Sequence, residues 1–292
     1  MTSIGIPLEP VELAGPESRV TNSAIISPEA SMDAKTFSRE VETHIRPGTF
    51  PVAVKLLGPD EPLPDKAKRP RRDMNVQIAI CQAVAMSRRY GWTLAVGEED
   101  VNCVLTKTAF GLAPLTEHYL EGNLACGMYT ATKEAGARTE AATDRLPAGK
   151  YKYLVTGPAG RIDFAPDAVI IYGNPAQVMR LVTGALWKHG GAITSSFTGR
   201  VDCSDEIIRP VLSGEYQVIL PCYGDRVFSQ TDDTEMAFSL PGAKMAELIE
   251  GLEGTHKGGI RYPIPAFLRY TPQYPQHYYE LEKIWAAGEQ SK

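Results

Sequence analysis

The chain has 292 residues, of which 43% are hydrophobic and 22% charged, and its formal net charge at pH 7 is −5. This composition is typical of a folded globular protein, and the acidic balance argues against a large nucleic-acid-binding surface. No stretch approaches the roughly 18 apolar residues of a membrane span, and residues 1–18 lack the basic and apolar regions of a signal peptide. We therefore expect a cytoplasmic protein that binds neither nucleic acid nor a membrane.

Residues 1–31 are rich in Pro, Ser and Glu without periodicity, which predicts a loose N-terminal arm. After the arm, helical and extended patterns alternate. Helices are predicted at 32–45, 74–91, 103–111, 115–121 and 131–146, and strands at 50–57 and 92–96. The basic run 66–72 between these elements favours a solvated turn, and the alternative is a clamp of its arginines on a small anion.

The second half is more regular. Strands are predicted at 152–157, 167–173, 192–197, 215–222 and 235–241, and helices at 174–190, 202–214 and 242–254. This alternation indicates an α/β or α+β fold in which helices pack on a mixed β-sheet. We expect one domain over residues 32–268, or two lobes that meet near 147–151, followed by a C-terminal strap at 269–292.

The strap contains several prolines and large aromatic side chains. Aromatic residues are enriched in protein interfaces, and an extended strap can reach a neighbouring subunit. The tail therefore predicts a homodimer to which residues 270–285 contribute.

Five cysteines in a chain without a secretion signal make a disulfide framework improbable. Their spacing contains no CxxC pair, which disfavours a compact zinc ribbon or a ferredoxin-type loop. A metal site assembled from separated thiols stays open, as do packing and nucleophilic roles. The five residues are Cys81, Cys103, Cys126, Cys203 and Cys222.

The predicted elements place these thiols differently. Cys203 follows a good helix N-cap, Asp202, where the helix dipole and the neighbouring Arg200 favour the thiolate. Cys222 and Cys103 also lie at the ends of predicted elements, which makes a functional role for them more plausible. Cys81 occupies the apolar face of a predicted helix interior, a position typical of a packing residue.

Long ordered motifs resemble a known family. The segments "ICQAVAMSRRYGWTLAVGEEDVNCVLTKTAFGL", "FAPDAVIIYGNPAQVMRLVTGALW" and "TSSFTGRVDCSDEIIRPVLSGEYQVILPCYGDRVFSQTDDTEMAFSLP", with shorter matches such as "FPVAVKLL", are similar to the bacterial and archaeal family of domain-of-unknown-function 169. The likeness covers about residues 46–268. It implies that thiols recur at the positions of Cys81, Cys103, Cys203 and Cys222 and vary at that of Cys126.

Polar side chains near Cys203 are candidates for contacting a substrate. Arg200 with Ser195, Ser196 and Thr198 offers a guanidinium and hydroxyls that suit a carboxylate.

Asn174 and Gln177 begin a predicted helix after a buried strand, where free N–H groups commonly bind anions, although a purely structural cap explains them as well. For Asp225 and Arg226, an ion pair with each other is favoured over a place in the site.

The leading hypothesis is an enzyme that holds an iron–sulfur cluster, of the 4Fe-4S type, through Cys81, Cys103, Cys203 and Cys222. Ligation by three thiols, with Cys81 the first to be left out, predicts a lyase that acts on a small anionic or hydroxylated substrate. Ligation by all four predicts electron transfer or an oxidoreductase. Two further alternatives are a non-catalytic binding or redox-sensing module without metal, and a metal-free enzyme with Cys203 as nucleophile.

Overall fold

The computed structural model of the protein describes residues 32–264 and 273–289. Within this part of the chain, six strands form one sheet in the order β2-β3-β1-β4-β6-β5, and each pair of neighbouring strands is antiparallel. The strands are β1 (Val52–Leu57), β2 (Leu94–Val96), β3 (Tyr153–Pro158), β4 (Ala168–Gly173), β5 (Gln217–Ile219) and β6 (Met236–Pro241).

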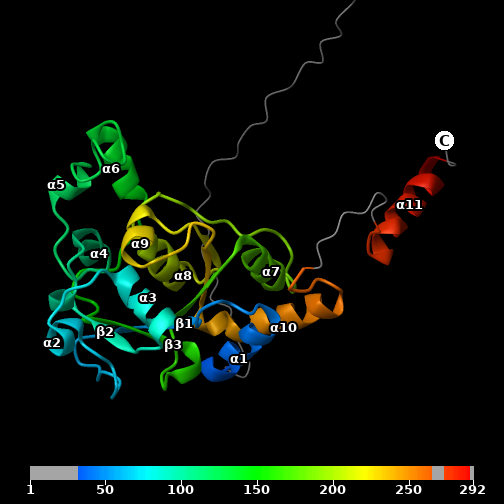
Figure 1. The fold of residues 1–292 in the computed structure, drawn as a ribbon. Coiled ribbons are helices and arrows are strands. Elements are labelled where there is room, and N and C mark those ends of the chain that lie inside the picture. Colours follow the sequence, from blue (N-terminus) through cyan, green and yellow to red (C-terminus); the bar gives the residue numbers. More distant parts are fainter. Residues whose placement is uncertain (1–31, 265–272, 290–292) are drawn as a thin grey trace, which may run out of the picture. The chain divides into compact units, whose positions relative to one another are not determined.

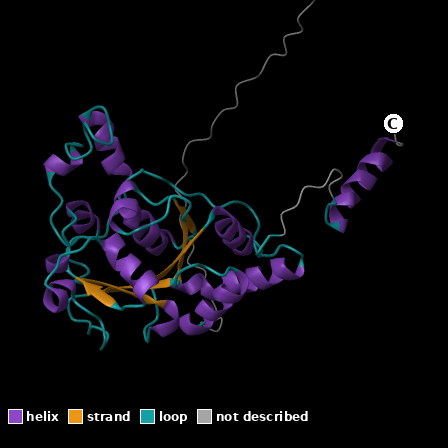
Figure 2. Ribbon diagram, in the orientation of Figure 1, coloured by secondary structure: helices purple, strands orange, loops and turns teal. Residues whose placement is uncertain are grey.

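Helices occupy most of the connections between the strands (Figures 1 and 2). In the first half of the chain they are α1 (Ala34–His44), α2 (Pro70–Met74), α3 (Ile80–Tyr90), α4 (Val104–Ala109), α5 (Glu117–Leu120) and α6 (Lys133–Ala142). In the second half they are α7 (Pro175–Ala185), a π-helical turn (Ser204–Ile208), α8 (Arg209–Ser213), α9 (Tyr223–Phe228), α10 (Met245–Lys257) and α11 (Tyr279–Glu289).

Both faces of the sheet are covered. Alternate residues of β4 point to opposite faces, so that Ile170 joins a cluster with α3 and the π-helical turn, while Ile171 joins a cluster with α1, α7 and α10. β4 is buried along its whole length. The fold is therefore a helical layer on each side of a central sheet, and the first of these helical layers carries the candidate site described below.

The predicted fold class, helices packed on a sheet, is confirmed, and the wholly antiparallel pairing of its named strands assigns it to the α+β type. The strand predicted at 192–197 is wrong, because these residues form no regular structure. There the Ser195 hydroxyl accepts a hydrogen bond from the Val218 amide of the edge strand β5 at 2.9 Å. The Ser195 side chain thus accepts the β5 amide that a further strand would have paired with.

Two predicted helices differ in ways that matter for the thiols. The helix expected at 74–91 is interrupted, because Asn75 adopts a left-handed conformation with φ of 53° and ends α2, and α3 begins only at Ile80. The helix expected at 202–214 contains a π-helical turn before Pro210. Pro210 has no N–H to donate to a carbonyl of the preceding turn, and a widened turn accommodates that loss.

Among the described residues, no helix is both long enough and apolar enough to cross a membrane. The N-terminal arm at 1–31, residues 265–268 of the predicted domain, and residues 269–272 and 290–292 of the predicted strap lie outside the described residues.

Candidate functional site

Four of the five cysteines line one cavity of about 450 Å³. They come from four separate segments, and each stands at the N-terminal end of a helix. Cys103 and Cys222 are the N-cap residues of α4 and α9, Cys203 directly precedes the π-helical turn, and Cys81 is the second residue of α3. The expectation that Cys81 lies in a helix interior is therefore wrong, and its position resembles those of the other three thiols.

Local hydrogen bonds explain why these segments meet. A bridge between Ile78 and Val101 aligns the chain before Cys81 with the chain before Cys103, and the amide of Ile78 donates to the Asp100 carbonyl at 2.8 Å. Beyond this bridge, the Gln82 side chain accepts the Ala79 amide at 2.9 Å and starts α3.

The other two thiols are joined by a carboxylate. Asp202 accepts a hydrogen bond from the Cys222 amide at 3.0 Å, so the residue before Cys203 is tied to Cys222. The side-chain Nε2 of Gln82 also donates to the Phe228 carbonyl at 3.4 Å, which connects α3 with α9. These contacts bring the four thiols to one cavity although no sequence motif groups them.

The backbone beside Cys203 is strained. Val201 has a φ of 56°, a conformation that a β-branched residue rarely adopts. Val201 is flanked by Arg200 and Asp202, and all three residues line the cavity. Strained residues cluster at functional sites. Here the left-handed conformation of Val201 determines how Arg200 and Asp202 are placed on either side of it.

Burial raises the pKa of three of the four thiols that line the cavity, Cys81, Cys203 and Cys222. Desolvation raises the pKa of Cys203 well above its ordinary value, and the nearby Asp202, Cys81 and Cys103 raise it further. Burial also raises the pKa of Cys81, and that of Cys222 to about 12. The expectation that Cys203 is a thiolate is therefore wrong for the metal-free protein, which removes the support for a simple cysteine nucleophile.

A group of buried acids stands beside the thiols. Burial, reinforced by Asp225, raises the pKa of Asp202 to about 7. The Tyr172 hydroxyl donates to Glu206 at 2.9 Å and lies 3.4 Å from Asp225. Glu206 Oε1 and Asp225 Oδ1 are buried and have no hydrogen-bond partner among the described residues.

The predicted ion pair between Asp225 and Arg226 is not formed. Arg226 instead donates to the backbone carbonyls of residues 232 and 235.

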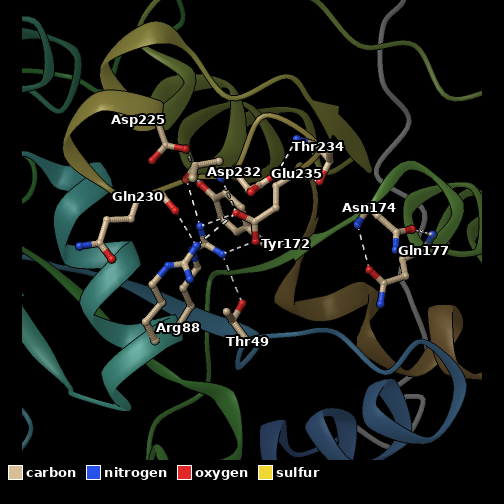
Figure 3. A network of polar contacts seen from close by, with 12 residues as sticks. Thr49, Arg88, Tyr172, Asn174, Gln177, Asp225, Gln230, Asp232, Thr234 and Glu235 are labelled. Atoms are coloured by element: carbon tan, nitrogen blue, oxygen red, sulfur yellow. Dashed lines mark hydrogen bonds and ion pairs between the residues drawn. The ribbon is translucent and has the colours of Figure 1, made fainter.

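Arg88 lies behind this acid group. Its guanidinium binds Glu235 through two hydrogen bonds of 2.7 and 3.0 Å and stacks over the Tyr172 ring at 4.0 Å (Figure 3). The sequence patterns identify neither Arg88 nor Glu206 as a site residue. One signal could have identified Arg88, because it is a charged residue on an otherwise apolar face of α3.

Arg200 lines the same cavity as the four thiols. Its side chain is buried, forms an ion pair with Glu140 and lies 5.0 Å from the Tyr129 ring centroid. Arg200 Nε is buried and has no partner among the described residues. The guanidinium is thus held in place by α6 while keeping a donor unused.

The other predicted site residues do not line this cavity. Ser195 bonds β5, and the Thr198 hydroxyl donates to the Arg200 carbonyl at 2.6 Å. Asn174 and Gln177 form a capping box at the start of α7, and Gln177 also donates to the carbonyls of residues 45 and 46. These bonds give them structural roles. The substrate contact expected of them, and of the exposed Ser196, stays a prediction.

In residues 32–264 and 273–289, no three His, Cys, Asp or Glu side chains are grouped as ligands of a single metal ion. The chemistry of the donor set nevertheless fits a larger sulfur-ligated group, because four thiols from four helix ends line one cavity and Cys126 does not.

Comparison with known proteins assigns the chain to a family. An uncharacterised protein of Methanocaldococcus jannaschii is 26% identical over 122 residues, which are 41% of this chain and 52% of that protein, so the match spans about half of the relative's length. No solved structure matches. The family model described as uncharacterised ArCR, domain-of-unknown-function 169, matches residues 40–251. Since this match covers well over half of the sequence, the resemblance is confirmed, and the chain belongs to this family.

Proposed function

We propose that the protein binds an iron–sulfur cluster, of the 4Fe-4S type, through Cys81, Cys103, Cys203 and Cys222, and that it acts on a small anionic substrate in the same cavity. The observation that carries the proposal is the meeting of these four thiols in one cavity of about 450 Å³. Thiolates are the usual ligands of such clusters.

The raised pKa values of Cys81, Cys203 and Cys222 make cluster binding a proton-releasing step. Burial keeps Cys81 and Cys203 protonated in the metal-free chain, and thiols bind iron as thiolates. The ligands also come from distant segments, so the site exists only in the folded chain. We therefore expect cluster binding and folding stability to be coupled.

Arg200 is the residue that we assign to the substrate. Its guanidinium lines the cavity, is fixed by Glu140 and keeps a buried, unused donor at Nε. A fixed guanidinium suits a carboxylate because it presents donors in a rigid fork. The aromatic rings of Tyr129 and Phe228 supply apolar walls for the rest of a small molecule.

A cluster held by three thiols would supply an open iron that acts as a Lewis acid, which favours a lyase of the hydro-lyase type. Electron transfer or an oxidoreductase is the second candidate, and the position of Cys81 favours it. Cys81 lines the cavity from a helix end in the same manner as the other three thiols. Four equivalent ligands would leave no iron open.

Anaerobic purification tests the proposal. The protein should be brown and should contain iron and acid-labile sulfide in near-equal amounts. A colourless protein that takes up neither iron nor sulfide under reducing conditions would instead support the redox-sensing module, in which the thiols are reversibly oxidised. We also propose a cytoplasmic location, because free thiols persist in that reducing compartment.

Arg200→Lys tests the substrate assignment. Lysine can keep the ion pair with Glu140 but lacks the fork, so the variant should retain its iron and bind a small carboxylate such as malate at least tenfold more weakly. Titration of the cluster's absorbance or spin-resonance spectrum with malate measures this affinity. Equal affinity in the variant and the parent would place Arg200 outside the substrate site.

We also propose that the protein is a homodimer. Within α11, Leu281, Ile284 and Trp285 expose large apolar surfaces, which a second copy could cover. Truncation after Arg269 should reduce the mass measured by light scattering to that of a monomer. A monomeric full-length chain at micromolar concentration would overturn this assignment.

A further inference from the structure

A second cavity, of about 680 Å³, lies between α1, the loop at 47–51 and the last turn of α3. Four cationic side chains line it, namely Lys35, Arg39, Arg88 and Arg89, against a single lining carboxylate, Glu42. The chain as a whole carries a net charge of −5. A groove with a local excess of positive charge attracts anions even on an acidic protein.

The cations differ in how far they are already paired. Glu235 binds both Arg88 and Arg89, and Arg39 contacts Glu40 at 3.2 Å. Lys35 is exposed and has no ion-pair partner among the described residues. The groove therefore keeps positive charge after its internal pairs are counted.

Neutral groups on the groove suit an oxyanion with an attached ring. The hydroxyls of Ser38 and Thr49 line it, and a Cβ placed on Gly48 would meet nothing within 4 Å, so a ligand can approach the backbone there. Phe50 is 39% exposed, and the Arg161 guanidinium lies 4.6 Å from the centroid of its ring. Hydroxyls, cations and an aromatic surface together match a phosphate ester better than a simple carboxylate, because several cations favour a doubly charged group.

Arg88 connects this groove with the thiol cavity. It lines the groove, its guanidinium stacks over Tyr172 at 4.0 Å, and the Tyr172 hydroxyl contacts Asp225 (Figure 3). Asp225 lines the cavity that contains the four thiols. A continuous series of contacts, from Arg88 to Tyr172 to Asp225, thus links the two cavities. Glu235 binds the Arg88 guanidinium.

We propose that the groove beside α1 binds a small phosphate ester, and that Arg88 transmits its occupancy to the thiol cavity. The Arg88 side chain is buried, and its Nη1 donates to the groove residue Thr49 at 3.4 Å, so a phosphate bound at Thr49 competes with Thr49 and Glu235 for the Arg88 guanidinium. Any shift of that guanidinium changes the surroundings of Tyr172 and hence of Asp225. The proposal does not depend on whether the thiols hold a cluster.

Calorimetry with phenyl phosphate as the probe, at low ionic strength, tests the binding site. The parent protein should bind it, and Lys35→Ala/Arg39→Ala should bind at least tenfold more weakly. The matched control is Lys133→Ala/Arg138→Ala, which removes two exposed cations from α6 and should leave the affinity unchanged. Equal weakening in both double variants, or equal affinity for benzoate and phenyl phosphate, would overturn the phosphate site.

Thiol alkylation tests the connection. In metal-free protein, saturating phenyl phosphate should change the iodoacetamide reaction rate of Cys222 or Cys81 at least twofold, measured by peptide mass spectrometry. The rate at Cys126, which does not line the thiol cavity, should not change. In Lys35→Ala/Arg39→Ala the effect should disappear at the same probe concentration. Binding without any change in thiol reactivity would contradict the role of Arg88.

Discussion

Two buried acidic side chains, Asp100 and Glu206, have their hydrogen-bonding capacity satisfied to different degrees. Asp100 is fully buried and accepts hydrogen bonds from Arg69 Nε and from the amides of Arg71 and Gly97, each at 2.9 Å. Glu206 is equally buried, but only one of its oxygens has a partner among the described residues. Both side chains lie in the protein interior, and Glu206 shares the Tyr172 hydroxyl with Asp225, which lines the thiol cavity.

This difference separates a structural role from a functional one. A buried carboxylate with a full set of donors holds its neighbours together, and the Arg69–Asp100 pair does so for the basic run, which is therefore neither a wholly solvated turn nor a free anion clamp. Buried carboxylates with unused oxygens are costly, and such groups are retained mostly where chemistry needs them. The acids beside the thiols are of this second kind.

Asp100→Ala should have the largest effect on stability. The substitution leaves the buried Arg69 guanidinium without its main partner and frees two backbone amides. Breaking a buried pair in this way costs about 3–5 kcal/mol. Urea unfolding at pH 7 should show this loss, whereas a loss below about 1 kcal/mol would remove the distinction between the two acidic side chains.

Glu206→Gln should have the opposite effect, and only at high pH. Burial, with Asp202 and Asp225 nearby, holds the pKa of Glu206 well above its ordinary value. The folded chain therefore keeps a proton that the unfolded chain releases above about pH 4.3, so the stability contributed by Glu206 is present at low pH and is lost as the pH rises through the folded pKa.

Glutamine cannot ionise and can still accept the Tyr172 hydroxyl. Metal-free Glu206→Gln should thus match the parent near pH 4 and exceed its stability at pH 8 by on the order of 1 kcal/mol or more. Unfolding curves at the two pH values provide the measurement. A variant that is less stable than the parent at pH 8 would mean that Glu206 is satisfied in the manner of Asp100.

Ser195→Ala should have the smallest effect. The substitution removes one partly buried hydrogen bond to the Val218 amide, which is worth about 1 kcal/mol, and it should leave iron content unchanged. Thermal unfolding and metal analysis measure the two quantities. Iron loss in this variant would indicate that Ser195 belongs to the thiol cavity, which its side chain does not line in the structure.

The sequence predicted the sheet-and-helix fold and most elements, because apolar periodicity reports which faces are buried. It missed the break before α3, since that break depends on the left-handed conformation of Asn75, which leaves the apolar pattern of the helix intact. It also missed α9, a helix of six residues that contains Gly224. These two local errors concealed the common position of Cys81 and Cys222 at helix N-termini.

The set of four thiols was predicted from the family resemblance, because their spacing alone does not group them. The acid group beside them was not predicted. Tyr172, Glu206 and Asp225 come from a strand, a π-helical turn and a short helix, and they meet only through the packing of these elements on the sheet. No periodicity along the chain reports a contact between such distant residues.

The most direct test of the central claim is the iron and sulfide content of single cysteine variants purified without oxygen. Cys103→Ala, Cys203→Ala and Cys222→Ala should each lose most of the iron that the parent protein binds, while Cys126→Ala, whose side chain lies outside the cavity, should keep it. Cys81→Ala tells the two candidate functions apart, because loss of iron indicates four ligands and retention indicates three. Equal iron content in all five variants, or loss in Cys126→Ala alone, would contradict the assignment of the thiol cavity as the cluster site.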